Sequence, residues 1–246
     1  MRLAVIADIH GNHLALEAVL ADIRAQGIDD IINLGDCFSG PLEAGKTADI
    51  LLTLDAVTVR GNHDRYLIEI DPDDLHISDR FAHGQMSKGH LEWIRGLPFS
   101  AVYRGEIFVC HATPSDDNTY WLETVSPDGF VHLKLIEEIE ALAEGIDQRL
   151  ILCGHSHLPR MVRLRDGRLI VNPGSVGAPA YDDDLPYFHK VEAGHPFASY
   201  AILEKTAGGW LPEFRQVNYD FQAMADLAAR NGRLEWASAL ATGWLR

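Results

Sequence analysis

The chain contains 246 residues, of which 47% are hydrophobic and 23% charged, and its formal net charge at pH 7 is −15. This composition is ordinary for a globular protein with a sizeable core. The acidic balance argues against long nucleic acids and anionic membranes as partners, because both present negatively charged phosphates.

Short apolar runs rich in β-branched residues predict strands, and stretches of helical periodicity separate several of them. The predicted strands cover residues 2–8, 30–36, 56–60, 106–111, 149–155 and 168–174. The clearest helical patterns cover residues 13–27 and 131–145. This alternation predicts an α/β architecture, with strands buried beneath helices on both faces.

The C-terminal part follows a different pattern. Residues 198–219 are typical of a β-hairpin that turns around Gly208 and Gly209, and residues 221–246 are largely helical in pattern. No linker, repeat or low-complexity tract divides the chain. We therefore expect residues 1–246 to form a single domain.

Two segments fit the α/β plan poorly. Residues 71–98 are polar and helix-like, with His76, His83 and His90 seven apart on one helical face. Such a stripe is more typical of a solvated face than of a metal site. Residues 178–197 read as an irregular stretch, and long loops of this kind are usually lids, binding loops or disordered. We expect this segment to form a lid or a partner-binding flap.

Polar residues stand at the ends of five predicted strands. They are Asp8 and His10, Asp36, Asn62 and His63, His111, and His155 and His157. The carboxyl ends of parallel strands meet at one edge of a sheet, where α/β proteins build their sites. In an extended chain, residues two apart point to the same side, so Asp8 and His10 are expected to face one centre, as are His155 and His157.

Imidazole and carboxylate groups bind zinc, manganese, iron and nickel, and the absence of thiolate pairs argues against a structural zinc site. Each polar residue taken alone has another explanation, such as a helix cap, a turn or a buried core histidine. Their joint appearance at successive strand ends favours a metal site. These candidate ligands, seven even without His63, exceed what one catalytic ion takes from protein, so two ions sharing a carboxylate are expected.

The ordered motifs resemble those of the calcineurin-like metallophosphoesterases, and most closely their small bacterial and archaeal phosphodiesterases. The matching stretches are DIHGN (8–12), GD (35–36), GNHD (61–64), a lone His111, GHSH (154–157) and NPGSVG (172–177). The resemblance implies a four-layer αββα sandwich with two divalent ions, manganese being expected before iron, nickel or zinc.

Specific roles follow from the same resemblance. The first ion is expected on Asp8, His10, Asp36 and His157. Asp36 is expected to bridge to a second ion held by Asn62, His111 and His155. His63 is expected to stay off the metals and to serve as the catalytic residue that faces the substrate. Asp64 is expected to orient or cap, and Gly61 to permit a sharp turn.

The implied activity is hydrolysis of small phosphodiesters or nucleotides through a metal-bridging hydroxide, with His63 protonating the departing alkoxide. A phosphomonoesterase or nucleotidase on the same site is one alternative, and a non-catalytic scaffold of this fold is another. The implied partner is a small phosphate ester, and homo-oligomerisation stays open.

Some residues depart from the family pattern or leave alternatives open. After NPGSVG the chain continues APAYDDDLPYF, without the arginine that relatives carry, so substrate choice is not implied. The NPGS amides either bind phosphate or form only a turn. Five aromatic residues either pack within loops or stack on a nucleobase: Tyr120, Trp121, Tyr181, Tyr187 and Phe188.

Targeting and redox features indicate a cytoplasmic location. The apolar start of the chain ends in Asp8 and His10 without a small-residue cleavage site, and no apolar run approaches the ~20 residues of a membrane helix. Cys37, Cys110 and Cys153 form no CxxC pair and are odd in number, so reduced, buried thiols are expected.

Overall fold

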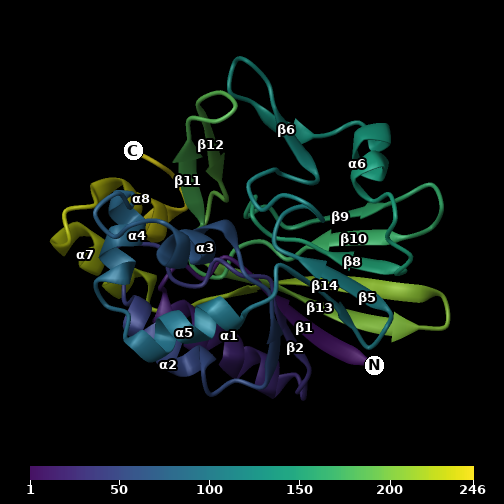
Figure 1. Cartoon of the computed structure of the whole chain (residues 1–246), viewed down its shortest axis with the longest axis horizontal. Helices are drawn as coiled ribbons and strands as arrows, with labels where there is room; N and C mark the ends of the chain where they lie inside the picture. Colours follow the sequence, from purple (N-terminus) through teal and green to yellow (C-terminus); the bar gives the residue numbers. More distant parts are fainter.

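The computed structural model describes all 246 residues and contains two five-stranded sheets packed face to face (Figure 1). Sheet I has the strand order β14-β13-β1-β2-β3, and sheet II has the order β4-β5-β8-β10-β9. Strands β1, β2 and β3 run parallel, as do β5, β8 and β10. The strands of sheet I are β1 (Arg2–Ile6), β2 (Ile31–Asn33), β3 (Ala56–Thr58), β13 (Ala198–Thr206) and β14 (Gly209–Val217). Those of sheet II are β4 (Ser100–Tyr103), β5 (Ile107–Cys110), β8 (Leu150–Leu152), β9 (Arg160–Arg163) and β10 (Leu169–Asn172).

The central strands are buried on both faces. In β1, Leu3 and Val5 belong to the apolar cluster between the sheets, while Ala4 and Ile6 belong to the cluster beneath the helices. This alternation is the period-two pattern of a pleated strand. Burying each large apolar side chain contributes about 1.5–3 kcal/mol. Sheet II adds Val109, Leu152 and Val171 to the cluster between the sheets.

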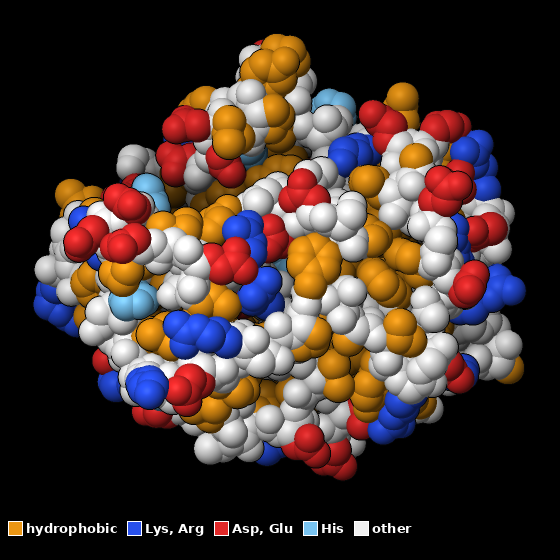
Figure 2. Space-filling view, viewed as in Figure 1, with side chains coloured by type: hydrophobic (Ala, Val, Ile, Leu, Met, Phe, Trp, Pro, Cys, Tyr) orange, Lys and Arg blue, Asp and Glu red, His pale blue; other side chains and the backbone are white.

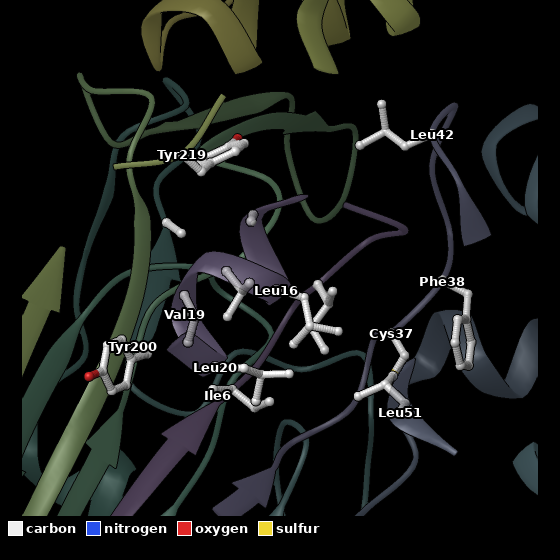
Figure 3. Close-up of a cluster of buried hydrophobic side chains, with 14 of the residues drawn as sticks. Ile6, Leu16, Val19, Leu20, Cys37, Phe38, Leu42, Leu51, Tyr200 and Tyr219 are labelled. Carbon is white, nitrogen blue, oxygen red and sulfur yellow. The ribbon is translucent and has the colours of Figure 1, made fainter. Parts of the chain in front are cut away.

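Helices cover the outer face of sheet I. Helix α1 (His13–Ala25) begins after Asn12, whose Oδ1 accepts a hydrogen bond from the Ala15 amide at 3.1 Å. Its Leu16 and Leu20 lie in the same core cluster as Ile6, as Figure 3 shows. The other helices of this cluster are α2 (Ala44–Leu51), α3 (Asn62–Glu69), α4 (Ile77–His83), α5 (Lys88–Gly96), α7 (Phe221–Arg230) and α8 (Leu234–Thr242).

A single helix, α6 (Ile136–Leu142), covers sheet II, and its Ile139 packs with Trp121 and Ile151. The layers are therefore helix, sheet, sheet and helix. This is the four-layer αββα sandwich that the sequence resemblance implied. The hairpin expected over residues 198–219 is confirmed by the pairing of β13 with β14, and the helical tail by α7 and α8. None of the helices combines the length and the apolar character that crossing a bilayer requires.

The helix predicted over residues 131–145 is wrong at its start. Residues Val131–Leu133 form strand β7, which pairs with β6 (Glu123–Val125), and only α6 is helical. The apolar spacing of residues 131–135 fits either structure, and pairing with β6 decides between them.

The single helical face predicted for the histidines of residues 71–98 is also wrong. This segment folds as two helices, α4 and α5, separated by a turn. His76 precedes α4, His83 ends it, and His90 lies in α5, where its side chain caps the helix start at Ser87. The histidines therefore belong to different helices.

The irregular stretch predicted for residues 178–197 is instead a hairpin of β11 (Ala180–Asp183) and β12 (His189–Glu192). Its acidic and proline-containing sequence has low strand propensity. Tertiary packing overrides that propensity, because His189 and Val191 are buried and the hairpin contacts α8 and β7. In Figure 1 the hairpin stands at the upper edge of the molecule.

Candidate metal centre

The seven candidate ligands and His63 lie together at one edge of the two sheets. Asp8 and His10 follow β1, Asp36 follows β2, and Asn62 and His63 begin α3 after β3. Sheet II contributes His111 after β5, and His155 and His157 after β8. The ligand atoms form two compact groups, Asp8–His10–His157 and Asp36–His111–His155, with Asn62 beside the second.

Left-handed backbone conformations direct most of these side chains toward the two ligand groups. Five of the candidate ligands have positive φ angles: Asp8 (54°), His10 (50°), Asp36 (53°), His155 (70°) and His157 (58°). Such angles are uncommon outside glycine and cost on the order of 1–3 kcal/mol each. The prediction that residues two apart share a side because the chain is extended is therefore wrong. The side chains converge because the chain turns sharply at each of them.

The first group presents lone pairs to a common point. The Nδ1 atoms of His10 and His157 lie 2.7 Å from the Ser39 carbonyl and 2.8 Å from the Ala178 carbonyl, so both donate and both Nε2 atoms are left unprotonated. The two Nε2 atoms are 3.1 Å apart. Oδ1 of Asp8 lies 3.6 Å from His157 Nε2, is buried, and has no hydrogen-bond partner. A cation satisfies all three atoms at once.

The second group converges in the same way. Nδ1 of His111 donates to the Leu34 carbonyl at 2.8 Å, and its Nε2 lies 3.1 Å from Asn62 Oδ1 and 3.2 Å from Asp36 Oδ2. The same Asn62 atom, Oδ1, also lies 3.2 Å from His155 Nδ1 and 3.2 Å from Asp36 Oδ2. Four acceptor atoms around one point fit a cation, to which the Asn62 amide offers its oxygen.

Burial leaves three of the candidate histidine ligands in the neutral form that metal ligation requires. It lowers the pKa of His10 and of His155 to about 4 and that of His157 well below its usual range, so these imidazoles are neutral at pH 7. Asp8 is the opposite case: burial, with a contribution from the nearby Asp36 carboxylate, raises its pKa to about 8, and a bound cation would favour its ionised form. His111 differs: burial opposes its protonation, but the Asp36 carboxylate outweighs burial and raises its pKa to about 10. A bound divalent ion would replace that proton.

Asp64 holds the loop that carries Asp36. Its carboxylate accepts hydrogen bonds from the amides of Asp36 (2.8 Å), Cys37 (2.9 Å) and Gly61 (3.1 Å), in keeping with the orienting role expected from the sequence. Gly61 itself has a φ of −87°, so the expected need for a special turn is wrong. Glycine is required there because a Cβ atom would lie 2.1 Å from Asp36 Oδ1.

The NPGSVG loop is a structural turn. Its Val176 and Gly177 amides donate to the carbonyls of Ala7 (2.9 Å) and Asp8 (3.0 Å), and the Ser175 hydroxyl also donates to Asp8 at 2.7 Å. These donors hold the end of β1 in its left-handed turn. Within NPGS itself, the Gly174 amide donates to Oδ1 of Asn172 at 2.9 Å, as in a turn.

His63 belongs to neither ligand group. Its Nδ1 lies 2.8 Å from Oδ1 of Asp79, a buried carboxylate on α4, and its ring is 5.7 Å from that of His10. Burial opposes protonation of His63, but Asp36 and Asp79 outweigh it and raise its pKa to about 9. Sequence reasoning missed Asp79, because no local signal links residue 79 to the GNHD motif.

Two tyrosines pack against the ligand histidines. The Tyr120 ring lies 5.1 Å from that of His155, and the Tyr181 ring 4.6 Å from that of His157. The two hydroxyl groups are 2.6 Å apart, and Tyr120 also bonds His189 at 2.9 Å. Trp121 is buried in the core, whereas Tyr187 and Phe188 are exposed on the hairpin.

A cavity of about 1230 Å³ opens over both ligand groups. The hairpin, α3, α4 and α8 contribute to its walls, and α8 adds Arg233 near its start and Trp236, which the sequence had not indicated. The Trp236 ring lies 6.0 Å from that of His10. The C-terminal helices therefore help to enclose the site.

The profile of the calcineurin-like phosphoesterase superfamily domain matches residues 1–194. The chain belongs to the calcineurin-like phosphoesterase superfamily. It is a metal-dependent phosphoric ester hydrolase, and the two ligand groups fit the divalent metals that this superfamily uses.

Similar proteins extend the match beyond residue 194. An uncharacterised protein from Methanocaldococcus jannaschii is 26% identical over 248 residues, which span 95% of this chain and 94% of the relative. The crystal structure of a metallophosphoesterase from Sphaerobacter thermophilus is 25% identical, with a TM-score of 0.77 over 99% of this chain and 100% of that one. A putative diadenosine tetraphosphatase structure, 16% identical with a TM-score of 0.52 over 87% of this chain and 93% of that one, shares the fold.

Proposed function

We propose that the protein is a dinuclear phosphodiesterase that hydrolyses small phosphodiesters. The observation that carries this proposal is the pair of adjacent ligand groups beneath one large cavity. Asp8, His10 and His157 would hold one ion, Asn62, His111 and His155 the other, and Asp36 would bridge them. Two bound divalent ions would neutralise charge on the phosphoryl group and lower the pKa of water to make a nucleophile.

We propose manganese as the first metal to test. The donor set mixes imidazole nitrogen with carboxylate and amide oxygen and contains no thiolate, so iron, nickel and zinc are the alternatives.

The three cysteines are buried and free, which supports the proposed cytoplasmic location.

His63 is proposed to protonate the departing alkoxide. Asp79 fixes the ring through Nδ1, which leaves Nε2 as the nitrogen that can serve a substrate in the cavity. General acid catalysis of this kind contributes about 10²- to 10⁴-fold to the rate. The presence of His63 also disfavours the alternative of a non-catalytic scaffold.

A diester is preferred to a monoester because of charge. A monoester carries two negative charges on its phosphate, and of the two Lys or Arg side chains of the cavity Arg233 is ion-paired with Glu235, which leaves only Lys134 to offset the second charge. The volume of the cavity also exceeds what a phosphate group alone would fill.

We propose that residues 1–246 act as one domain, because α8 completes the cavity wall.

The direct test is turnover of bis(p-nitrophenyl) phosphate and of p-nitrophenyl phosphate by apo-protein reloaded separately with manganese, iron, nickel and zinc. We expect kcat/KM to be higher for the diester with at least one metal. Faster hydrolysis of the monoester with every metal would favour the phosphomonoesterase. Hydrolysis of neither ester with any metal would favour the scaffold.

A further inference from the structure

The floor of the cavity and the wall formed by the β11–β12 hairpin differ in charge. At its floor, two divalent ions would bring +4 against the charges of Asp8 and Asp36, so this end attracts one phosphate. The upper wall is different. Its β11–β12 hairpin carries three carboxylates without an ion-pair partner, Asp182, Asp183 and Asp184, and Asp74, which lines the cavity from the segment before α4, has none either. In Figure 2 acidic side chains gather around this hairpin, at the upper left.

The Lys and Arg side chains of the cavity offset only part of this negative charge. Arg233 forms an ion pair with Glu235 and donates to the Ser78 hydroxyl at 2.9 Å. Lys134 donates to the Tyr120 carbonyl. A second phosphate or a carboxylate on the substrate would therefore meet a single lysine without an ion-pair partner, Lys134, against four such carboxylates.

Aromatic surface accompanies the acidic groups. Tyr66, Tyr181, Phe188 and Trp236 all line the cavity. Aromatic faces attract quaternary and primary ammonium groups, and more strongly where carboxylates stand nearby. The wall is thus suited to a positively charged or neutral group and repels an anionic one.

We propose that the enzyme selects phosphodiesters that carry one negative charge and whose second ester arm is cationic or neutral, such as an amino-alcohol arm, and that it discriminates against substrates with a second anionic group. This inference rests on the proposed phosphodiesterase function. In the reaction the P–O bond to the leaving alcohol breaks, the oxygen of water forms the new P–O bond, and the second arm stays on the product monoester.

Three p-nitrophenyl phosphodiesters test the proposal, because they share a leaving group and differ only in the second arm: choline, ethyl and carboxymethyl. We expect kcat/KM to fall in that order, with about a tenfold difference between choline and carboxymethyl at low salt. Raising NaCl to 0.5 M should lower kcat/KM for the choline ester and raise it for the carboxymethyl ester, because screening weakens both effects.

Two matched triple variants distinguish an effect of the hairpin carboxylates from an effect of the protein's net charge. Asp182→Asn/Asp183→Asn/Asp184→Asn should reduce the choline-to-carboxymethyl ratio to about threefold. Glu137→Gln/Glu144→Gln/Asp147→Asn makes the same change in net charge on exposed residues at and after α6, and should leave the ratio unchanged. Equal kcat/KM for the three esters, a reversed order, or a hairpin variant that keeps the wild-type ratio would overturn the proposal.

Binding tests the same preference without turnover. Calorimetry on manganese-loaded protein should show phosphocholine binding more tightly than phosphoglycolate, with the difference reduced in the hairpin variant. Tighter binding of phosphoglycolate would refute the charge selection. If no diester is hydrolysed but phosphocholine is preferred, the proposed reaction fails while the charge selection stands.

Discussion

Nδ1 of His63 lies 2.8 Å from Oδ1 of Asp79, which joins the first turn of α3 to α4 across 16 residues of sequence. The carboxylate favours the imidazolium form and fixes which ring nitrogen remains for the substrate. In Asp79→Asn we therefore expect the pKa of His63 to fall. Activity that needs imidazolium is present below that pKa and is lost as the pH rises through it.

The basic limb of the pH–rate profile for an alkyl phosphodiester should consequently move to lower pH in Asp79→Asn. One pKa unit corresponds to about a tenfold loss of the protonated fraction above the pKa. Metal content should stay unchanged, as measured by elemental analysis. A profile that does not move would show that Asp79 does not tune His63.

Substitution of His63 itself separates catalysis from metal binding. In His63→Asn both ions should stay bound, because His63 belongs to neither ligand group, and kcat should fall about 10²- to 10⁴-fold for an alkyl ester. The loss should be smaller for a nitrophenyl ester, whose phenolate departs with little help from an acid. His132→Asn, on an exposed part of β7, is the control. Loss of metal in His63→Asn would make this residue a ligand.

Asp36→Ala tests whether Asp36 bridges the two metal ions. If Asp36 joins the two ions, this variant should lose both of them, whereas Asp29→Ala, at an exposed position, should keep both. Elemental analysis after dialysis against metal-free buffer is the measurement. Retention of one ion per chain in Asp36→Ala would show that Asp36 serves only one site.

Gly61→Ala tests the close approach of Gly61 to Asp36 beside the metal centre. The new methyl group would lie 2.1 Å from Asp36 Oδ1, so Asp36 must move, and metal binding and thermal stability should both fall. Gly96→Ala is a matched control, because a Cβ atom there meets nothing within 4 Å at the end of α5. Normal metal content in Gly61→Ala would mean that the loop adapts without cost to the site.

Deletion of residues 181–193 tests the hairpin as a lid. These residues include Tyr181 against His157 and line the cavity at Leu185 and Phe188. We expect KM and substrate preference to change far more than metal content. Unchanged kinetics across several substrates would reduce the hairpin to a surface insertion.

The sequence by itself determined the α/β pattern, the order of the motifs and the chemistry of the ligands. These features are local: an apolar β-branched run predicts a buried strand, and the residue that follows it is fixed by the chain. Parallel pairing of β1 and β2 then brings Asp8 and Asp36 to a common edge, whereas His111 joins them from sheet II through the packing of the two sheets.

Only the tertiary structure decided how these residues converge and what surrounds them. The left-handed turns at Asp8 and His155 depend on hydrogen bonds from the Gly177 amide and to Asp8 Oδ2, both distant in sequence. Asp79 and Trp236 reach the site because α4 and α8 pack beside it, and the acidic hairpin forms because buried residues on β12 outweigh its weak strand propensity. Such contacts join residues far apart in the chain, and their energies exist only once the core has formed.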